Sequence, residues 1–237
     1  KAQSNKFRYI FSAGEAISAD LVKKIYQVFP DIKLENIYGP TESTIYATKY
    51  SLPKDHLGSL VPIGKPLANI HAFILNKHYQ LQPIGVPGEL CLAGAGLARG
   101  YLNNAELTKA SFIEHPFDPG KKLYKTGDLA RLRADGNIEY LGRMDRQIKI
   151  RGFRIELDEI RYHLLQDESI RDAVVVARTD RHQQPYLCAY FLSEKEWTVG
   201  ALRRLLESKL PEYMIPSYFV QMDQFPLTSS GKVDYKS

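Results

Sequence analysis

The sequence predicts an α/β core fragment, made of a βαβ unit and a β-rich, barrel-like subdomain, followed by a small α+β domain. Three observations predict this class. Strand, helix and strand patterns follow one another at the start of the chain. Short apolar runs between Gly-, Pro- and Asn-rich turns fill its middle, and helical periods return beside strand patterns after Gly142.

The opening βαβ unit occupies residues 7–39. "FRYIFSAGE" is typical of a buried strand, and "KLENIYG" predicts a second strand. Between them, "SADLVKKIYQVF" predicts a helix with Ser18 as its N-cap and Pro30 just beyond its end. The apolar side chains of that helix share one face: Leu21, Val22, Ile25 and Val28.

The middle of the chain, from about Pro62 to Gly142, is expected to be largely β. "HAFIL", "GELCLAG" and "ARLRADGNIEYLG" are short apolar runs bounded by turn residues. The last run contains Asp135-Gly136, a dipeptide typical of a tight hairpin turn.

In the last part of the chain, strand patterns again alternate with helix patterns. "QIKIR" predicts a strand, and "ELDEIRYHLL" places Leu157, Ile160 and Leu164 on one helical face. "DAVVVA" and "PYLCAYFL" predict paired strands, and "TVGALRRLLESKL" predicts a helix that Pro211 stops. We therefore expect two domains, residues 1–143 and 144–237, the second long enough for a small fold of its own.

Composition limits the classes of protein to which this chain can belong. The net charge of +5 would permit nucleic-acid binding, but acids alternate with bases in "GRMDRQIKIRGFRIELDEIR", which favours a solvated charged face and no nucleic-acid partner. No apolar run approaches the roughly 18 residues of a membrane span, so no membrane partner is expected. The first residues have neither an initiator Met nor the layout of a signal peptide, so we expect a piece of a longer protein.

The two cysteines, Cys91 and Cys188, stand in apolar, strand-like runs without metal-ligand spacing. Buried, reduced thiols are the expected state. Because disulfides are rare in the cytosol, this predicts a cytoplasmic protein.

Two glycine-containing stretches carry more polar residues than packing requires. "NIYGPTEST" ends a strand with a turn and then presents hydroxyls and a carboxylate, which suits either a phosphate and its metal or an ordinary polar loop. "GAGLARGYLNN" has closely spaced glycines, for which close backbone approach or tight turns are the favoured explanation.

Two further stretches carry charge. Asp128 in "YKTGDLARL" is expected after a glycine turn at the start of a hairpin, where it could accept ribose hydroxyls or cap its own turn. "GRMDRQIKIRGFRIELDEI" places an arginine and an aspartate at the predicted domain junction, as a hinge or as interdomain ion pairs. Near the end, Lys232 in "SSGKVDYKS" follows a glycine but lacks the remaining residues of a P-loop.

In this order the stretches resemble the motifs of the adenylation domains of nonribosomal peptide synthetases, which are adenylate-forming enzymes. "LPEYMIP" and "SSGKVD" complete the set, and the resemblance runs from "FSAGEAIS" to the last residues. It implies the C-terminal part of such a domain: residues 1–143 belong to the large core and residues 144–237 form the small lid. The preceding half of the core would hold the phosphate loop, so we expect this chain alone to be inactive.

The resemblance implies activation of a carboxylate, that of an amino acid by family habit, with ATP and Mg²⁺. The acyl group would then pass to the phosphopantetheine thiol of a peptidyl carrier domain. Tyr38 would stack on adenine, Asp128 would bind the ribose and Thr41 the α-phosphate, while Glu42 would help to hold Mg²⁺. The full set of implied nucleotide-binding residues is Gly14, Glu15, Ala16, Asn36, Tyr38, Gly39, Thr41, Asp128, Tyr140 and Arg143.

Three more roles follow from the resemblance. Lys232 would be the catalytic lysine, because a fixed ammonium lowers the repulsion between carboxylate and phosphate. Asp145 would be the hinge, and Gly152 would line the thiol channel or serve as a plain turn glycine. The implied substrate pocket is mostly apolar with one phenol hydroxyl, which favours an uncharged apolar or aromatic side chain: Phe11, Ala13, Ile37, Ile45 and Tyr46.

Two alternatives stay open. An acyl-CoA or aryl-acid ligase of the same superfamily would release its product onto free CoA. A non-catalytic basic binding module would bind nucleic acid in a salt-sensitive manner and would not respond to ATP.

Overall fold

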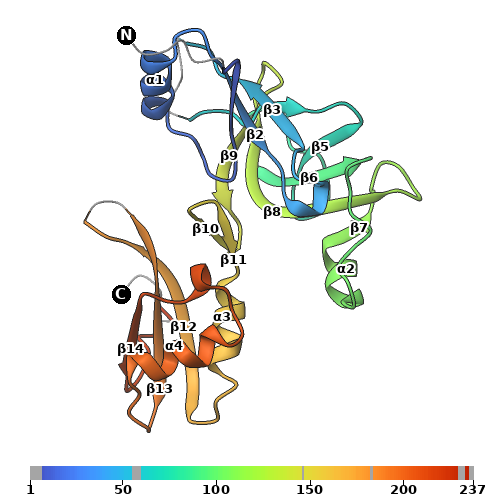
Figure 1. The fold of residues 1–237 in the computed structure, drawn as a ribbon. Helices are drawn as coiled ribbons and strands as arrows, with labels where there is room; N and C mark the ends of the chain where they lie inside the picture. The colour runs from blue at the N-terminus through green and yellow to red at the C-terminus, as the bar shows by residue number, and fades with distance from the viewer. Residues whose placement is uncertain (1–6, 55–59, 146, 182–183, 229–232, 235–237) are drawn as a thin grey trace. The chain divides into compact units, whose positions relative to one another are not determined.

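The computed structural model describes residues 7–54, 60–145, 147–181, 184–228 and 233–234. The chain forms two compact units, residues 1–145 and 146–237, called here the large and the small unit and each described by itself. The α/β character expected from the sequence is present in both (Figure 1). No helix in the described ranges is long and apolar enough to cross a membrane.

The first sheet of the large unit contains the predicted βαβ unit. Strand β1 (Tyr9–Ser12) lies parallel to β2 (Lys33–Tyr38), with helix α1 (Ala19–Val28) between them in sequence. The predicted cap is confirmed, since the Ser18 side chain accepts a hydrogen bond from the Leu21 N–H at 3.2 Å. After the short 3₁₀ helix η1 (Thr41–Ser43), β3 (Thr48–Ser51) and β4 (Lys65–Pro66) complete the order β1-β2-β3-β4.

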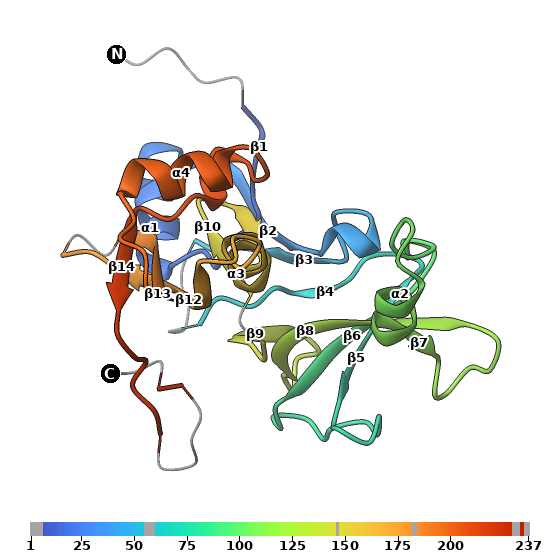
Figure 2. The ribbon, with the colours of Figure 1, turned by 90° about the horizontal axis from the view of Figure 1, so that it is seen from below.

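The second sheet of the large unit has the order β5-β6-β8-β7, with β9 paired to β8. Figure 2 shows α2 beside β7 at one end of this sheet. The bounds of these elements are β5 (Ile70–Leu75), β6 (Gly88–Gly94), α2 (Ala105–Ser111), β7 (Phe112–Glu114), β8 (Lys122–Leu132) and β9 (Ile138–Arg143). Two features join this second sheet to the first sheet. One is a bridge between Gly64 and Ile138, and the other is a core cluster that contains both Tyr38 and Leu92.

One part of an expectation about this sheet is wrong. Asp128 stands at the start of the β8–β9 hairpin, opposite Arg143, as expected, but it does not follow a turn, because it lies inside β8, an 11-residue strand. Gly127 has a φ of +70°, and the pairing of β8 with both neighbours shifts register near this point. The glycine therefore marks an irregularity within a continuous strand rather than a chain reversal.

In its described residues, the small unit is a three-stranded sheet with helices α3 and α4 on one face (Figure 1). Its elements are β10 (Ile148–Ile150), β11 (Phe153–Ile155), α3 (Leu157–Leu164), β12 (Ile170–Thr179), β13 (Pro185–Ser193), α4 (Val199–Glu207), the 3₁₀ helix η2 (Glu212–Met214) and β14 (Tyr218–Met222). The sheet has the order β12-β13-β14, and β10 and β11 form a separate hairpin. Helix α4 ends at Glu207, before Pro211, because the chain tightens there and the Lys209 N–H bonds to the Leu206 carbonyl.

Both cysteines are buried and free, as the sequence predicts. Cys91 lies in β6 and Cys188 in β13. Burial raises the pKa of each thiol above its ordinary value, which keeps the unreactive protonated form at neutral pH.

Candidate functional site

A buried carboxylate, that of Asp128, links the two sheets of the large unit. The Tyr38 hydroxyl, on β2, donates a hydrogen bond to one of its oxygens. The guanidinium of Arg143, at the end of β9, donates to the other oxygen at 2.9 Å. Asp128 is 5% exposed and Tyr38 is 8% exposed, so both are held inside the fold. Two residues far apart in sequence thus fix the orientation of one acid.

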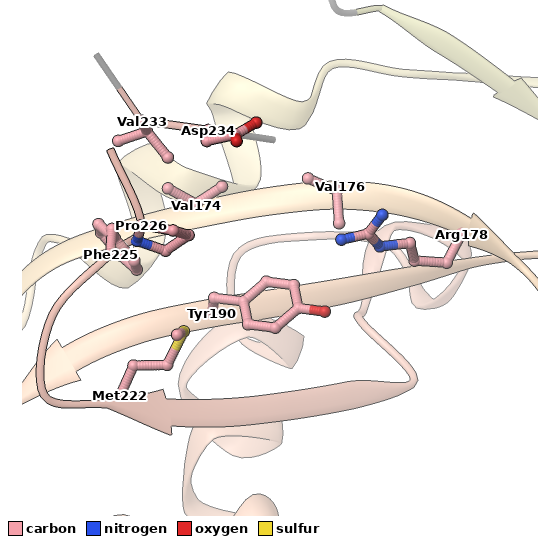
Figure 3. Close-up of a pocket in the computed structure, with 9 residues that line it drawn as sticks. All are labelled: Val174, Val176, Arg178, Tyr190, Met222, Phe225, Pro226, Val233 and Asp234. Atoms are coloured by element: carbon pink, nitrogen blue, oxygen red, sulfur yellow. The ribbon is translucent and has the colours of Figure 1, made fainter. Parts of the chain in front are cut away.

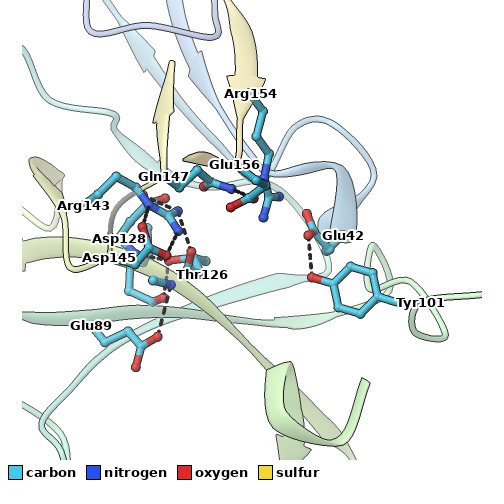
Figure 4. A network of polar contacts seen from close by, with 12 residues as sticks. Glu42, Glu89, Tyr101, Thr126, Asp128, Arg143, Asp145, Gln147, Arg154 and Glu156 are labelled. Atoms are coloured by element: carbon cyan, nitrogen blue, oxygen red, sulfur yellow. Dashed lines mark hydrogen bonds and ion pairs between the residues drawn. The ribbon is translucent and has the colours of Figure 1, made fainter. Parts of the chain in front are cut away.

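Arg143 is shared between two acids, as Figure 4 shows. Besides Asp128, it donates to the Thr126 carbonyl at 2.7 Å and contacts both carboxylate oxygens of Asp145. Burial alone would lower the pKa of the guanidinium, but the hydrogen bonds and charges of Asp145 and Asp128 outweigh it and raise that pKa. The arginine is therefore a permanent cation, held in a fork geometry suited to carboxylates.

Gly127 makes room for this arrangement. A Cβ at this position would lie 2.7 Å from Nη2 of Arg143 and 2.8 Å from Oδ2 of Asp145. The positive φ of the glycine adds a conformational reason for its presence. The motif around Asp128 thus needs its glycine to admit the arginine, which the sequence pattern does not reveal.

Two phenols lie close to Asp128. Burial, followed by the negative charge of Asp128, raises the pKa of both Tyr38 and Tyr140. Their rings are tilted by 36° with centroids 6.4 Å apart. Both hydroxyls therefore stay protonated at neutral pH, and Tyr38 serves as a hydrogen-bond donor to the acid.

A second carboxylate, that of Glu42 in η1, is also buried. The Tyr101 hydroxyl donates to its Oε1 at 2.6 Å. Burial, and next this hydrogen bond, raise the pKa of Tyr101. No sequence motif gives Tyr101 a role, because only the folded chain brings together residues that are 59 positions apart.

The glycine-rich stretch "GAGLARG" packs directly on the "TES" turn. The Ala98 N–H donates to the Glu42 carbonyl at 2.8 Å, and the Thr44 hydroxyl donates to the Gly96 carbonyl at 2.7 Å. A Cβ on Gly96 would lie 2.9 Å from the Ser43 carbonyl oxygen. Close backbone approach, the explanation favoured from the sequence, is confirmed for this stretch.

The donor set around Glu42 fits Mg²⁺. No group of three or more His, Cys, Asp or Glu side chains in the described ranges could form an all-protein metal cage. Mg²⁺ does not require one, because it commonly uses one or two carboxylates together with substrate phosphates and water. Glu42, with the exposed Thr41 beside it, would supply such a partial site.

The remaining residues that were predicted to bind the nucleotide also belong to the large unit. Asn36 is buried, and its Nδ2 donates to the Pro62 carbonyl at 2.8 Å. Gly14 has a φ of +87°, and Glu15 and Ala16 are exposed. At Gly39 a Cβ would lie 2.5 Å from the Ile45 carbonyl oxygen, so the turn after β2 requires glycine.

The predicted pocket residues differ in exposure. Phe11, Ala13, Ile45 and Tyr46 are exposed, whereas Ile37 is buried and presents little surface to a ligand. Ile45 has a φ of +73°, directly after Thr44 at +59°. Positive φ is rare for a β-branched residue, and such strain gathers at functional sites.

In the small unit, Lys232 lies outside the described residues, whereas Leu227 before it and Val233 and Asp234 after it are described. Leu227 and Val233 form a bridge, and the Asp234 N–H donates to the Pro226 carbonyl at 2.8 Å. Figure 3 shows Val233 and Asp234 beside a cavity of about 50 Å³ over β12 and β13. The cavity is lined mainly by apolar side chains: Val174, Val176, Tyr190, Met222, Phe225, Pro226 and Val233.

Gly152 occupies a two-residue turn between β10 and β11. Arg151 and Gly152 have φ values of +53° and +78°, and Ile150 pairs with Phe153. Both central residues of a type I′ hairpin need positive φ, so the turn by itself accounts for the glycine. Among the described residues, a Cβ there would meet nothing within 4 Å.

Two family descriptions match the chain. Residues 1–102 match the AMP-binding enzyme family, and residues 163–232 match the AMP-binding enzyme C-terminal domain. The chain belongs to the AMP-binding enzyme family. The motif order that pointed to adenylate-forming enzymes is thereby confirmed.

Curated relatives of this AMP-binding chain are peptide synthetases. It is 66% identical over 235 residues to one of the linear gramicidin synthase proteins of Brevibacillus parabrevis, covering 99% of this chain and 5% of that protein. It is 52% identical over 233 residues to bacitracin synthase 3 of Bacillus licheniformis, covering 98% of this chain and 4% of that protein. The chain therefore spans only a small part of these relatives.

Solved structures of AMP-binding proteins share the fold. One is PA1221, an NRPS protein with adenylation and PCP domains bound to a vinylsulfonamide inhibitor, with 31% identity, a TM-score of 0.80, and coverage of 96% of this chain and 39% of that one. Another is the Vibrio cholerae adenylation domain AlmE in complex with glycyl-adenosine-5'-phosphate, with 27% identity, a TM-score of 0.81, and coverage of 95% and 43%. The fold is that of an adenylation-domain fragment.

Proposed function

We propose that this chain is the C-terminal part of an amino-acid adenylation domain of a nonribosomal peptide synthetase. The domain converts an acid and ATP to an acyl-adenylate and pyrophosphate, and then transfers the acyl group to the phosphopantetheine thiol of a peptidyl carrier domain. The observation that carries this proposal is the buried Asp128, oriented by Tyr38 and Arg143. The similarity to peptide synthetases supports it.

Asp128 binds the ribose. Each of its carboxylate oxygens accepts one of the two hydrogen bonds described above, which leaves further lone pairs for the ribose hydroxyls. Tyr38 contributes the face of its ring to adenine, and Tyr140 borders the same acid. Because the Nδ2 of Asn36 is bound to Pro62, its side-chain oxygen is the atom suited to accept from the adenine amine. Gly14, Glu15 and Ala16 supply backbone against the adenine.

Glu42 holds Mg²⁺ and Thr41 contacts the α-phosphate. When bound, Mg²⁺ neutralises phosphate charge. The chain's own contribution is to keep the Glu42 carboxylate inside the fold and oriented by a hydrogen bond.

Lys232 places its ammonium between the attacking carboxylate and the α-phosphate, which lowers the repulsion between two anions. Asp145, the last residue of the large unit, is the hinge, and Gly152 lines the thiol channel. Four pocket residues, Phe11, Ala13, Ile45 and Tyr46, present an apolar surface with one phenol, and Ile37 supports it from within. We infer an acid with an uncharged apolar or aromatic side chain.

The test joins this chain to the preceding half of the domain and measures pyrophosphate exchange into ATP across amino, hydroxy and keto acids. Exchange is expected with one or a few acids. Lys232→Ala should lower the rate by about 10²- to 10³-fold with nearly unchanged ATP affinity, since it removes a charge that acts on the reaction.

The matched control is Lys209→Ala, which removes an exposed lysine of the small unit and should leave exchange unchanged. No exchange with any acid would contradict the proposal. Product released onto free CoA instead of a carrier would favour the acyl-CoA ligase alternative, and salt-sensitive binding of nucleic acid without any effect of ATP would favour the basic binding module.

A further inference from the structure

The contact between Tyr101 and Glu42 joins a residue of the proposed magnesium site to a stretch that had no assigned function. Tyr101 follows the glycine-rich stretch, and its hydroxyl lies 2.6 Å from Oε1 of Glu42 (Figure 4). Glu42 itself is only 6% exposed. A buried carboxylate is costly to keep charged, so a donor at this distance stabilises the ionised form and fixes its orientation.

Tyr101 is held in place by elements that do not include Glu42. Its backbone N–H donates to the Thr108 hydroxyl of α2 at 2.9 Å. Its ring packs edge-on against Phe112 of β7, with centroids 5.7 Å apart. Gly100, with a φ of +143°, permits the close approach of Thr108. The phenol therefore reaches Glu42 from a rigid support.

The backbone reinforces the same pairing. The Ala98 N–H bonds to the Glu42 carbonyl at 2.8 Å, three residues before Tyr101. The glycine-rich stretch thus contacts both the main chain and the side chain of Glu42. A phenol suits this place better than a lysine, because a neutral donor orders the carboxylate without cancelling the negative charge that attracts a cation.

We propose that Tyr101 is a positioning residue for the metal site: its hydroxyl fixes the Glu42 carboxylate in the orientation that binds a divalent cation. The inference rests on the proposed function of Glu42. It predicts that loss of the hydroxyl weakens metal binding, while the chemistry at saturating metal persists.

The experiment uses Tyr101→Phe in the complete adenylation domain. The Mg²⁺ concentration at half-maximal pyrophosphate exchange should rise by about 10-fold, the lower end of the range for residues that orient metal ligands. Binding of Mn²⁺, followed by electron paramagnetic resonance with ATP and without acid, should weaken by a similar factor. The maximal rate at saturating Mg²⁺ and the KM for the acid should remain close to those of the parent.

The control is Tyr26→Phe, which removes another hydroxyl of the large unit that donates at 2.6 Å, in this case to the Leu52 carbonyl. It should leave both metal measurements unchanged. If Tyr101→Phe lowers only the melting temperature, as Tyr26→Phe would, the positioning role is overturned.

Glu42→Gln distinguishes a failure of the inference about Tyr101 from a failure of the proposed role of Glu42. If it shifts both metal measurements and Tyr101→Phe shifts neither, the inference about Tyr101 is wrong while Glu42 keeps its proposed role. If Glu42→Gln shifts neither, the proposed function of Glu42 is wrong and the inference falls with it. Adding Tyr101→Phe to Glu42→Gln should cause no further loss, because the hydroxyl acts through that carboxylate.

Discussion

The large and small units bury different kinds of side chain. In the described part of the large unit, acids and amides such as Glu35, Asn36, Glu42 and Asp128 are buried among three separate apolar clusters. The small unit is built instead around one extended apolar cluster that spans α3, β12, β13 and α4. A second, smaller cluster covers the other face of its sheet.

This difference separates two tasks. A buried polar group costs free energy unless its hydrogen-bond partners are in place. Part of the interior of the large unit therefore orients charged groups instead of contributing apolar packing. The small unit gains stability from continuous packing of its apolar cluster. Substitutions of buried polar residues in the large unit should therefore affect ligand binding, whereas substitutions in the apolar core of the small unit should act mainly on stability.

The largest expected effect is on the core of the small unit. Phe191 is 1% exposed in the apolar cluster, so Phe191→Ala should lower the free energy of unfolding by about 3–5 kcal/mol. Urea denaturation, with hydrogen exchange to locate the loss in residues 146–237, measures this. Tyr218→Ala, at an aromatic residue 59% exposed on β14, should change the free energy by about 0.5 kcal/mol or less. Equal losses from the two would contradict the division of tasks.

An intermediate effect is expected at Asp128. In Asp128→Asn the amide can accept from either Tyr38 or Arg143 but turns its NH₂ toward the other donor. We expect a loss of about 1–3 kcal/mol in unfolding free energy and a clear loss of ATP affinity, measured by calorimetry.

Asp118→Asn is the control for that change, since it replaces an aspartate paired with Lys121 at a half-exposed position. It should leave ATP affinity unchanged. The comparison with Lys232→Ala is decisive: if both Asp128→Asn and Lys232→Ala weakened ATP binding equally, the separation of binding from chemistry would fail.

The smallest expected effect is at Gly152. Because a Cβ there meets no described residue within 4 Å, Gly152→Ala should cost only the strain of a positive φ, about 1 kcal/mol. Gly120→Ala is its match in the large unit, with a φ of +85° and equally open surroundings. Pyrophosphate exchange should be unaffected by either. Transfer to the carrier thiol should slow several-fold only in Gly152→Ala if the glycine lines the thiol channel, and unchanged transfer would leave it a turn residue.

Elements with local signals could be predicted from the amino-acid sequence. Helix α1 with its Ser18 cap, strand β6 and the β12–β13 pair follow from periodicity and capping over a few residues. The order of the motifs was also sufficient to indicate the family, because that order is a property of the chain and not of its folding. Short elements such as β4, β7 and α2 were missed, since only their neighbours stabilise them.

The pairing of the charged groups, in contrast, depends on the tertiary fold. Asp128 lies inside a strand, Arg143 is divided between two acids, and Tyr101 reaches Glu42, because the path of the backbone brings these groups within hydrogen-bond distance. Arg143 and Asp145 are only two residues apart, but no local pattern encodes the pairs of Asp128 with Tyr38 and of Glu42 with Tyr101. These distant pairs depend on loop closure and on burial.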